Sequence, residues 1–179
     1  HNAHVMSLCL TLHVNLGLSL RKTSQALKDL YNISISHQQI ANYCKTAAIC
    51  IKPFVDQYPY EKNEVFTADE TYIKVKGKWT YLYRAVNANG HTLDFMFSQH
   101  RDMKAALRFF KQTISQNASP HTINIDKSKA NTAALVTLTQ PNCFTFKIRQ
   151  CRYKNNIVEQ DHRFIKKRCR PMLGFKSFK

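Results

Sequence analysis

The spacing of apolar residues over positions 19–51 predicts two helices separated by a short turn. Apolar side chains recur every three or four residues on each side of a break at residues 32–35. Ser36, with Gln39 three residues later, has the pattern of a capping box and marks the start of the second helix. The pair is a helix-turn-helix candidate, although a helical hairpin that only packs gives the same pattern.

If this pair of helices binds DNA, its second helix presents polar residues near its start to the major groove. These residues are His37, Gln38, Asn42 and Lys45. Asn and Gln side chains suit the edges of adenine, which favours such a role. Residues 53–63 contain two prolines and no regular period, so they are predicted as a linker. Residues 1–60 therefore form the expected DNA-binding region and linker.

Beyond this linker the pattern changes to strands and then to alternating helices and strands. β-Branched and aromatic residues mark the strands, and Asn89-Gly90 predicts a hairpin turn. The element order fits an α/β, ribonuclease H-like fold with a mixed five-stranded sheet flanked by helices, although order alone leaves other α/β folds open. The expected strands cover residues 64–75, 78–88, 91–98, 122–126 and 143–148, and the expected helices cover residues 101–116, 130–138 and a segment from about Asn155.

The chain is strongly basic. It has 27 Lys and Arg against 11 Asp and Glu, a formal net charge of +16 in 179 residues. Residues 147–179 alone carry +9 of this charge. Such a field concentrates polyanions at the surface, while 44% hydrophobic and 11% aromatic residues indicate a packed domain rather than a basic tail. Nucleic acid is therefore the expected partner.

Other classes of protein receive less support. The six cysteines include no C-x-x-C pair and no His at zinc spacing, so we expect reduced thiols rather than structural zinc. The sequence has no long apolar run and no signal peptide, so we expect a cytoplasmic protein without a membrane partner. Because it begins at His1 and stops at Lys179 inside a basic segment, we expect a fragment.

Three acidic residues that are far apart in the sequence are candidates for one metal site. Asp69 lies in the first expected strand, Asp126 ends the fourth, and Glu159 lies one turn into the last helix. In this fold the first and fourth strands are neighbours, so the carboxylates can converge. Oxygen ligands alone suit Mg²⁺ or Mn²⁺, and two such ions serve in-line phosphoryl transfer. For each acid taken singly, a solvated surface carboxylate is the alternative.

Acids next to these candidates are expected to point elsewhere. Alternation along a regular strand puts Glu70 on the face opposite Asp69, so Glu70 is not expected to share the site. Asp161 is rotated by about 200° from Glu159 around the helix and also faces away. His162 either assists near the metals or hydrogen-bonds the backbone.

Basic residues follow Glu159 along the last helix. Arg163, Lys166 and Arg170 continue its face, and Lys167 lies beside them. They are candidates for holding phosphates next to the scissile bond, although a solvated charged face produces the same run.

Lysines also mark the first hairpin. Lys74, Lys76 and Lys78 alternate to one side, with Trp79 next to them, and form a candidate DNA-facing edge. Lysines that protect an edge strand would look identical. The tyrosines of this hairpin are expected to pack across the strands rather than stack on bases.

Five separate segments of the chain together resemble the DDE transposases of bacterial insertion-sequence family six. The segments are ADETYIKVKGKWTYLYRAV, DFMFSQHRD, IDKS, YKNNIVEQDHRFIKKR and RPMLGFKSF. The likeness runs from about residue 16 to residue 179, and several motifs in the right order make it specific. By this resemblance Asp69, Asp126 and Glu159 match the family's three catalytic, metal-binding acids.

The resemblance implies more than the residues alone do. It implies a retroviral-integrase-like catalytic domain over residues 61–179, a helix-turn-helix that helps recognise terminal inverted repeats, and two Mg²⁺ ions for which Mn²⁺ substitutes. It also implies a homo-oligomer on the bacterial nucleoid that cleaves 3′ ends and joins them to target DNA, typically giving cointegrates.

Two alternatives stay open. One is a nuclease or resolvase of the same fold without the joining step. The other is an inactive transposase that only binds DNA.

Overall fold

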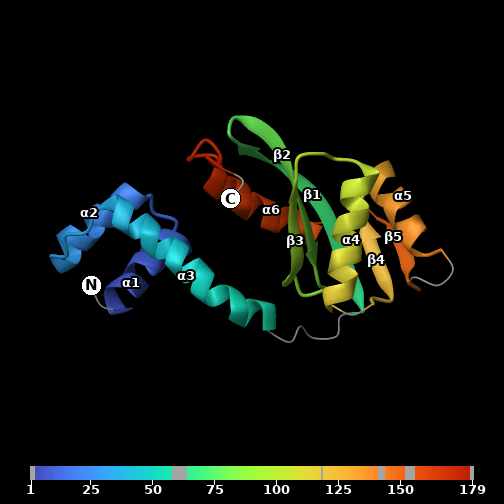
Figure 1. Ribbon diagram of the computed structural model, residues 1–179, viewed down its shortest axis with the longest axis horizontal. Helices are drawn as coiled ribbons and strands as arrows, with labels where there is room; N and C mark the ends of the chain where they lie inside the picture. Colours follow the sequence, from blue (N-terminus) through green and yellow to red (C-terminus); the bar gives the residue numbers. More distant parts are fainter. Residues whose placement is uncertain (1–2, 58–63, 118, 141–143, 152–155, 178–179) are drawn as a thin grey trace. The chain divides into compact units, whose positions relative to one another are not determined.

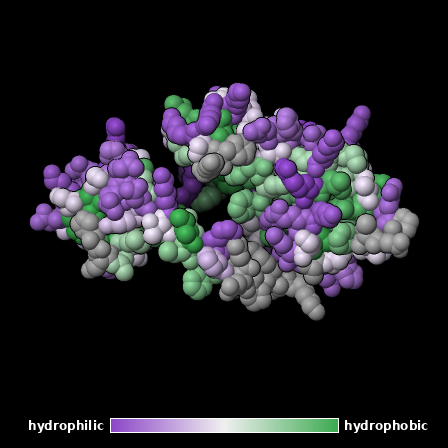
Figure 2. All heavy atoms as spheres, viewed as in Figure 1, coloured by the Kyte–Doolittle hydropathy of each residue, from purple (hydrophilic) through white to green (hydrophobic). Residues whose placement is uncertain are grey.

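The computed structural model describes residues 3–57, 64–117, 119–140, 144–151 and 156–177. The chain divides into two compact units, His1–Pro59 and Tyr60–Lys179 (Figure 1). Hydrophilic side chains cover much of the visible surface (Figure 2), as expected for a chain of this charge. None of the helices in the described parts of the chain is both long and apolar enough to span a bilayer.

The described elements of the first unit are all helices, joined by short connections at residues 16–19 and 32–36. The unit contains α1 (Ala3–Leu10), the π-helical turn η1 (Thr11–Asn15), α2 (Leu20–Tyr31) and α3 (His37–Gln57). A small core joins them, formed by Cys9, Leu27, Ile35 and Ile40.

Local chemistry sets the ends of the two longer helices. Ser19 caps α2 by accepting a hydrogen bond from the Lys22 amide. Asn32 ends α2 in the left-handed conformation at φ 52°, which Asn tolerates better than most residues. Ser36 accepts from the Gln39 amide at 3.1 Å, which confirms the predicted start of α3.

The predicted start of the linker at Pro53 is wrong, because α3 continues through Pro53 to Gln57. Proline inside a helix removes one N–H donor, at a typical cost of about 3 kcal/mol, but its fixed φ near −65° is itself helical. The helix can therefore continue past it with one hydrogen bond fewer. Residues 58–63 of the predicted linker lie outside the described residues.

The second unit contains a five-stranded sheet with the order β3-β2-β1-β4-β5. Its strands are β1 (Val65–Val75), β2 (Lys78–Val86), β3 (Thr92–Ser98), β4 (Thr122–Ile125) and β5 (Lys147–Gln150). The first three strands are antiparallel, and β4 and β5 run parallel to β1. This is the mixed sheet predicted from the element order, and strands one and four are neighbours as expected.

The β5 strand differs from its predicted bounds, because it begins at Lys147 rather than near residue 143. Phe144 and Phe146 pack partly buried against the core but precede the strand. Their alternation therefore reflects contact with the core rather than strand pairing. Residue 143 lies outside the described residues.

Helices cover both faces of the sheet (Figure 1). On one face α4 (Met103–Asn117) and α5 (Lys129–Leu138) pack on Phe66, Ala68 and Tyr83. On the other face α6 (Asn156–Cys169) packs on β1 and β2. Because successive strand residues alternate between faces, Asp69 lies on the α6 side and Glu70 on the α4 and α5 side.

The β1–β2 hairpin extends beyond the part of β1 that pairs with β4. It turns at Lys76 and Gly77, whose φ angles of 50° and 76° are those of a two-residue hairpin turn. The expected alternation of Lys74, Lys76 and Lys78 to one side of the hairpin is therefore wrong, because Lys76 lies in the turn itself and Lys78 pairs with Val75 on the other face.

A short C-terminal segment continues the ladder along the free edge of this hairpin. Phe175 exchanges backbone hydrogen bonds of 2.8 Å with Lys74 and Lys76, which forms an isolated parallel bridge beside Val75. Gly174 precedes it at φ 93°, and a side chain there would collide with the backbone of Lys74.

Candidate active site

Asp69 lies in the middle of β1 on the face that α6 covers, with its side chain only 16% exposed. Burial, followed by the nearby carboxylates of Glu70, Asp126 and Glu159, raises the pKa of Asp69 from 3.8 to about 7. A hydrogen bond from the Glu70 amide opposes part of this rise. Asp69 is thus a carboxyl group surrounded by other acids, in a position where charge is costly without a cation.

Asp126 follows directly after β4. The parallel register pairs Thr67 with Asn124, and two further residues along each strand bring Asp126 level with Asp69. The Asp126 carboxylate accepts a hydrogen bond from the Ser128 amide at 3.0 Å, which fixes its orientation at the turn into α5.

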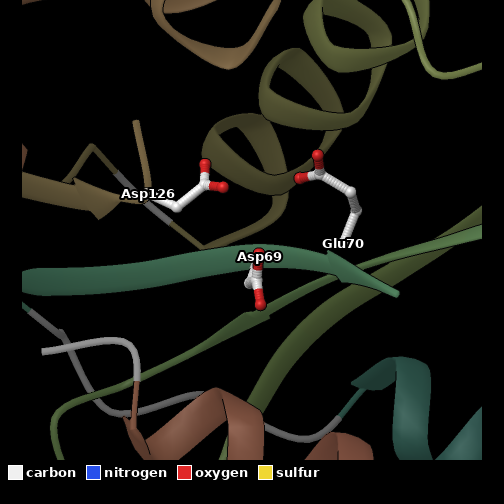
Figure 3. A group of neighbouring side chains, drawn as sticks. All are labelled: Asp69, Glu70 and Asp126. Carbon is white, nitrogen blue, oxygen red and sulfur yellow. The ribbon is translucent and has the colours of Figure 1, made fainter. Parts of the chain in front are cut away.

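Glu70 lies closer to these two acids than strand alternation suggests. One oxygen from each of Asp69, Glu70 and Asp126 lies within 4.8 Å of the other two. Figure 3 shows the Glu70 and Asp126 carboxyl groups turned toward each other on one side of β1, with Asp69 on the other side. Glu70 does face away from Asp69, as predicted, yet one of its oxygens still belongs to the same group of three. Asp126 stands one residue beyond the end of β4, and its carboxylate has an oxygen within 4.8 Å of oxygens of both other acids.

The Glu70 carboxylate already has polar neighbours. Its side chain is 1% exposed, and its two oxygens accept from Arg101 at 2.5 Å and from Asn131 at 2.8 Å. Arg101 precedes α4 and Asn131 lies in the first turn of α5. Glu70 therefore ties the strand that carries Asp69 to the two helices on the opposite face.

Glu159 lies in the first turn of α6 and is exposed. Its charge acts on Asp69, because it contributes to the raised pKa of that carboxyl group. Val158 and His162 anchor α6, with Val158 fully buried and His162 4% exposed. The side chain of Asp161, predicted to face away, lies outside the described part of the structure.

His162 contacts the first acid directly. Its Nδ1 lies 3.5 Å from Oδ2 of Asp69. Burial, together with the positive charges of Arg84 and Lys166, lowers the pKa of His162 from 6.5 to about 4, so the ring is neutral at pH 7. Among the described residues, its buried Nε2 has no hydrogen-bond partner.

The candidate basic residues of α6 divide into two groups. Arg163, Lys167 and Arg170 are exposed, whereas Lys166 is half-buried with its Nζ 5.9 Å from the centre of the Tyr72 ring. Lys166 therefore points to the hairpin, and the other three point to solvent.

Lys74 and Lys76 are both exposed on the hairpin, and the Lys74 ammonium lies 5.0 Å from the Trp79 ring centre. In the first unit the four candidate DNA-reading side chains are exposed on the N-terminal half of α3. They are His37, Gln38, Asn42 and Lys45.

Sequence reasoning gave no role to Arg84, Arg101 or Asn131. The cross-strand register places Arg84 opposite Asp69, and Arg101 lies in a segment that marks the family resemblance. A hairpin register predicted from the Lys76-Gly77 turn would have identified Arg84. No local signal points to Asn131, because its contact spans 61 residues of sequence.

Comparison with solved structures establishes the class of fold. The structure resembles the catalytic core domain of HTLV-2 integrase in complex with magnesium, with a TM-score of 0.50 and 19% identity over 62% of this chain and 71% of that one. At this identity the likeness shows the fold alone. The sheet and its flanking helices are therefore ribonuclease H-like, of the retroviral integrase type.

Sequence comparison gives the family. Residues 63–179 match the family described as DDE domain, and residues 1–120 match the one described as Transposase IS66 family. The transposase for insertion sequence-like element IS431mec of Staphylococcus aureus strain Mu50 is 31% identical over 172 residues, covering 93% of this chain and 75% of that protein. The transposase of IS257 in transposon Tn4003, also from S. aureus, gives the same values.

The chain therefore belongs to the DDE transposases of bacterial insertion sequences, and family six fits these relatives. Its enzymatic class is that of a polynucleotidyl transferase that acts in DNA transposition. Membership also implies DNA binding and the use of a divalent metal ion, for which the carboxylates around Asp69 offer oxygen ligands.

Proposed function

We propose that this chain cleaves the 3′ ends of its insertion sequence and transfers them to target DNA, with Asp69, Asp126 and Glu159 as the catalytic metal ligands. The observation that carries the assignment is the electrostatic environment of Asp69. Burial and the surrounding acids raise its pKa to about 7, so this cluster gains stability when a divalent cation neutralises it.

The donor set fits Mg²⁺, with Mn²⁺ as a substitute, because it consists of carboxylate oxygens. Asp69 and Asp126 come from neighbouring strands, and Glu159 comes from a helix that packs on the same strand. Two bound ions supply an activated attacking oxygen and a stabilised leaving oxygen for in-line transfer. Glu70 is left out of the ligand set because Arg101 and Asn131 occupy its oxygens.

The remaining residues position the metal ligands and the DNA. His162 holds α6 against β1 through its contact with Asp69. Glu159 lies three residues earlier on the same helix and is therefore positioned near Asp69. We assign recognition of the terminal inverted repeats to the exposed side chains of α3, which are His37, Gln38, Asn42 and Lys45. We assign phosphate contacts near the scissile bond to Lys74, Lys76, Arg163, Lys166, Lys167 and Arg170.

One set of three acids serves one DNA end at a time, whereas an element has two ends. We therefore infer a homo-oligomer assembled on paired ends and target DNA, which places the working protein on the nucleoid. The mass of the complex on paired end fragments, measured by light scattering, tests this inference. A complex that contains one protein chain and still joins both ends would contradict it.

Substitution of the acids tests the metal-ligand assignment. Asp126→Asn and Glu159→Gln should each abolish metal-dependent cleavage of an end fragment and leave end binding nearly unchanged. Glu64→Gln is the matched control, because Glu64 is an exposed acid at the start of the same unit. Cleavage that persists in both variants would contradict the assignment of these acids as metal ligands.

A second assay separates transposition from simple hydrolysis. Pre-cleaved ends with a free 3′-hydroxyl are mixed with plasmid target, Mg²⁺ and wild-type protein, and joined products are counted. Hydrolysis without joining would indicate a nuclease or resolvase, and binding without either reaction would indicate a protein that only binds DNA.

A further inference from the structure

The β1–β2 hairpin has two faces with different surroundings. The face that carries Ile73 and Val75 is buried, and the C-terminal segment bonds to the adjacent edge through Phe175. The opposite face carries Tyr72 and Trp79, which stay 50% and 62% exposed. The hairpin thus presents large aromatic rings to solvent on one side only.

These aromatic rings form a connected group. Tyr72 and Trp79 contact each other edge-to-face with ring centres 6.3 Å apart, and Tyr72 contacts Tyr81 in the same manner at 5.9 Å. Tyr72 and Tyr81 are direct cross-strand partners, as the sequence predicted. Tyr81 is also packed against the core, so it supports the Tyr72 ring, which in turn contacts Trp79. Two side chains are therefore held in place with much of their ring surface free.

Two ammonium groups lie beside these rings. Lys74 reaches to 5.0 Å from the centre of the Trp79 ring, and Lys166 reaches to 5.9 Å from the centre of the Tyr72 ring. An aromatic face with an adjacent cation suits a nucleotide, whose base stacks on the ring and whose phosphate pairs with the cation. An apolar peptide or a membrane surface would not require a cation next to each aromatic ring.

The aromatic group lies on the strand that carries the first acid, but on the other face of that strand. Tyr72 follows Asp69 by three residues along β1, which corresponds to about 10 Å at the usual rise of a strand, and alternation places Tyr72 on the face that carries Glu70. Stacked bases are spaced by about 3.4 Å, so the distance along the strand alone corresponds to roughly three nucleotides. A DNA strand that runs from the scissile phosphate around the hairpin to the rings would therefore place on them bases that lie a few nucleotides from that phosphate.

We propose that Tyr72 and Trp79, with Lys74 and Lys166, form a stacking platform for unpaired bases at the DNA end. The placement of this platform near the scissile phosphate rests on the proposed function of Asp69. The capacity of the platform to stack bases is independent of that function. Duplex DNA hides the faces of its bases, so the platform selects an end whose last base pairs have opened. Cross-strand packing of the rings without any ligand is the competing explanation.

The chain carries its own probe, because Trp79 is its only tryptophan. Metal-free wild-type protein is titrated with a single-stranded oligonucleotide and with an abasic deoxyribose-phosphate oligomer of the same length. We expect the oligonucleotide to quench Trp79 fluorescence and the abasic oligomer to leave it nearly unchanged. Equal quenching by the two oligomers, or none by either, would overturn the stacking platform.

Variants give a second measurement. Tyr72→Leu and Trp79→Leu should each weaken single-strand binding about five- to one-hundred-fold, with a much smaller effect on duplex binding. Phe95→Leu is the matched control, since Phe95 is a 57% exposed aromatic on the neighbouring strand β3, outside the platform. An equal loss for single-stranded and duplex DNA, or a loss in the control as large as in the variants, would refute base stacking.

Cleavage assays locate the platform at the end of the element. The two Leu variants should cleave a fully paired end more slowly and recover with an end whose terminal three base pairs are mismatched. Quenching without cleavage in wild type would leave the platform standing and reject the proposed transferase. Cleavage without quenching would reject the platform alone.

Discussion

The Nδ1 atom of His162 lies 3.5 Å from Oδ2 of Asp69, across the contact between α6 and β1. This pair joins the helix that carries Glu159 to the strand that carries Asp69. Carboxylates that bind metals are usually oriented by a neighbouring hydrogen-bonding group. Loss of that neighbouring group typically lowers metal affinity or activity 10- to 100-fold. A neutral, buried imidazole at this distance has the chemistry for that role.

Replacing His162 should therefore affect the metal-dependent step. His162→Leu is expected to slow end cleavage about 10- to 100-fold and to raise the Mg²⁺ concentration required. His162→Asn keeps an N–H donor near the position of Nδ1 and should recover most of the activity. Rates are measured across a Mg²⁺ titration, with thermal melting as a check on folding.

Val158→Ala is the control for packing, because Val158 is fully buried one turn earlier in α6. It should lower the melting temperature without changing the Mg²⁺ requirement. If the Leu variant of His162 needs no more Mg²⁺ than wild type, the contact with Asp69 has only a packing role.

The raised pKa of Asp69 predicts a pH-dependent cost in the metal-free protein. The folded pKa of about 7 exceeds the unfolded value of 3.8, so the native state holds the proton more tightly than the unfolded state. Asp69 therefore lowers the free energy of unfolding as pH rises from about 4 to about 7. Asp69→Asn should thus stabilise the metal-free protein at pH 8, by roughly 2 kcal/mol, and have little effect at pH 4.

Urea unfolding of both proteins at the two pH values measures this difference. His162 acts in the opposite sense, since its lowered pKa makes stability rise between about pH 4 and 6.5, so the comparison must be between variants. Adding Mg²⁺ at pH 8 should stabilise wild type more than Asp69→Asn. Equal stability of the two metal-free proteins at pH 8 would contradict the raised pKa.

The pairing of Glu70 with Arg101 predicts a strong coupling between these residues. Arg101→Leu leaves a carboxylate that is 1% exposed without its cation, and should destabilise the protein by about 1–3 kcal/mol, a range that allows for the partial exposure of Arg101. The double variant with Glu70→Gln should recover part of this loss, because no buried charge remains. A double-mutant cycle by urea unfolding measures the coupling free energy, and additive effects would show that the pair contributes none.

The assignment of α3 to DNA reading predicts different effects for its two kinds of polar side chain. Asn42→Ala should reduce the preference for inverted-repeat ends over random duplex about five- to one-hundred-fold, since an amide reads a base edge. Lys45→Ala should weaken binding to both DNAs alike and reduce the salt dependence. Competition binding at two salt concentrations separates them. Equal losses of preference in both variants would argue against base reading by Asn42.

Much of the fold follows from local patterns in the sequence. Alternation located β1, β2 and β3 within two residues of their observed ends, and Ser36 fixed the start of α3. The expected strands over residues 64–75 and 78–88 leave residues 76 and 77 for the turn, which is where the structure has it. Pro53 suggests the end of a helix, because the low helix propensity of proline does not show that a helix can continue past it with one backbone hydrogen bond fewer.

The site was less predictable, for reasons of distance along the chain. The acids were identified from strand ends, helix position and family motifs. The contact of Glu70 with Arg101 spans 31 residues, and whether His162 meets Asp69 depends on the rotation of α6 about its axis. Neither quantity is encoded in a local pattern. Strand alternation also could not show that an oxygen of Glu70 lies within 4.8 Å of oxygens of Asp69 and Asp126.

Gly174 has a consequence for how molecules of this protein meet one another. The hairpin projects past β4, so the backbone groups at its tip would form an open edge that a strand from another molecule could extend. The chain's own segment at Phe175 takes that edge instead, and only a residue without a side chain fits against Lys74 at position 174. We therefore expect Gly174→Ala to displace the segment and to leave the tip open to pairing with a strand of another molecule.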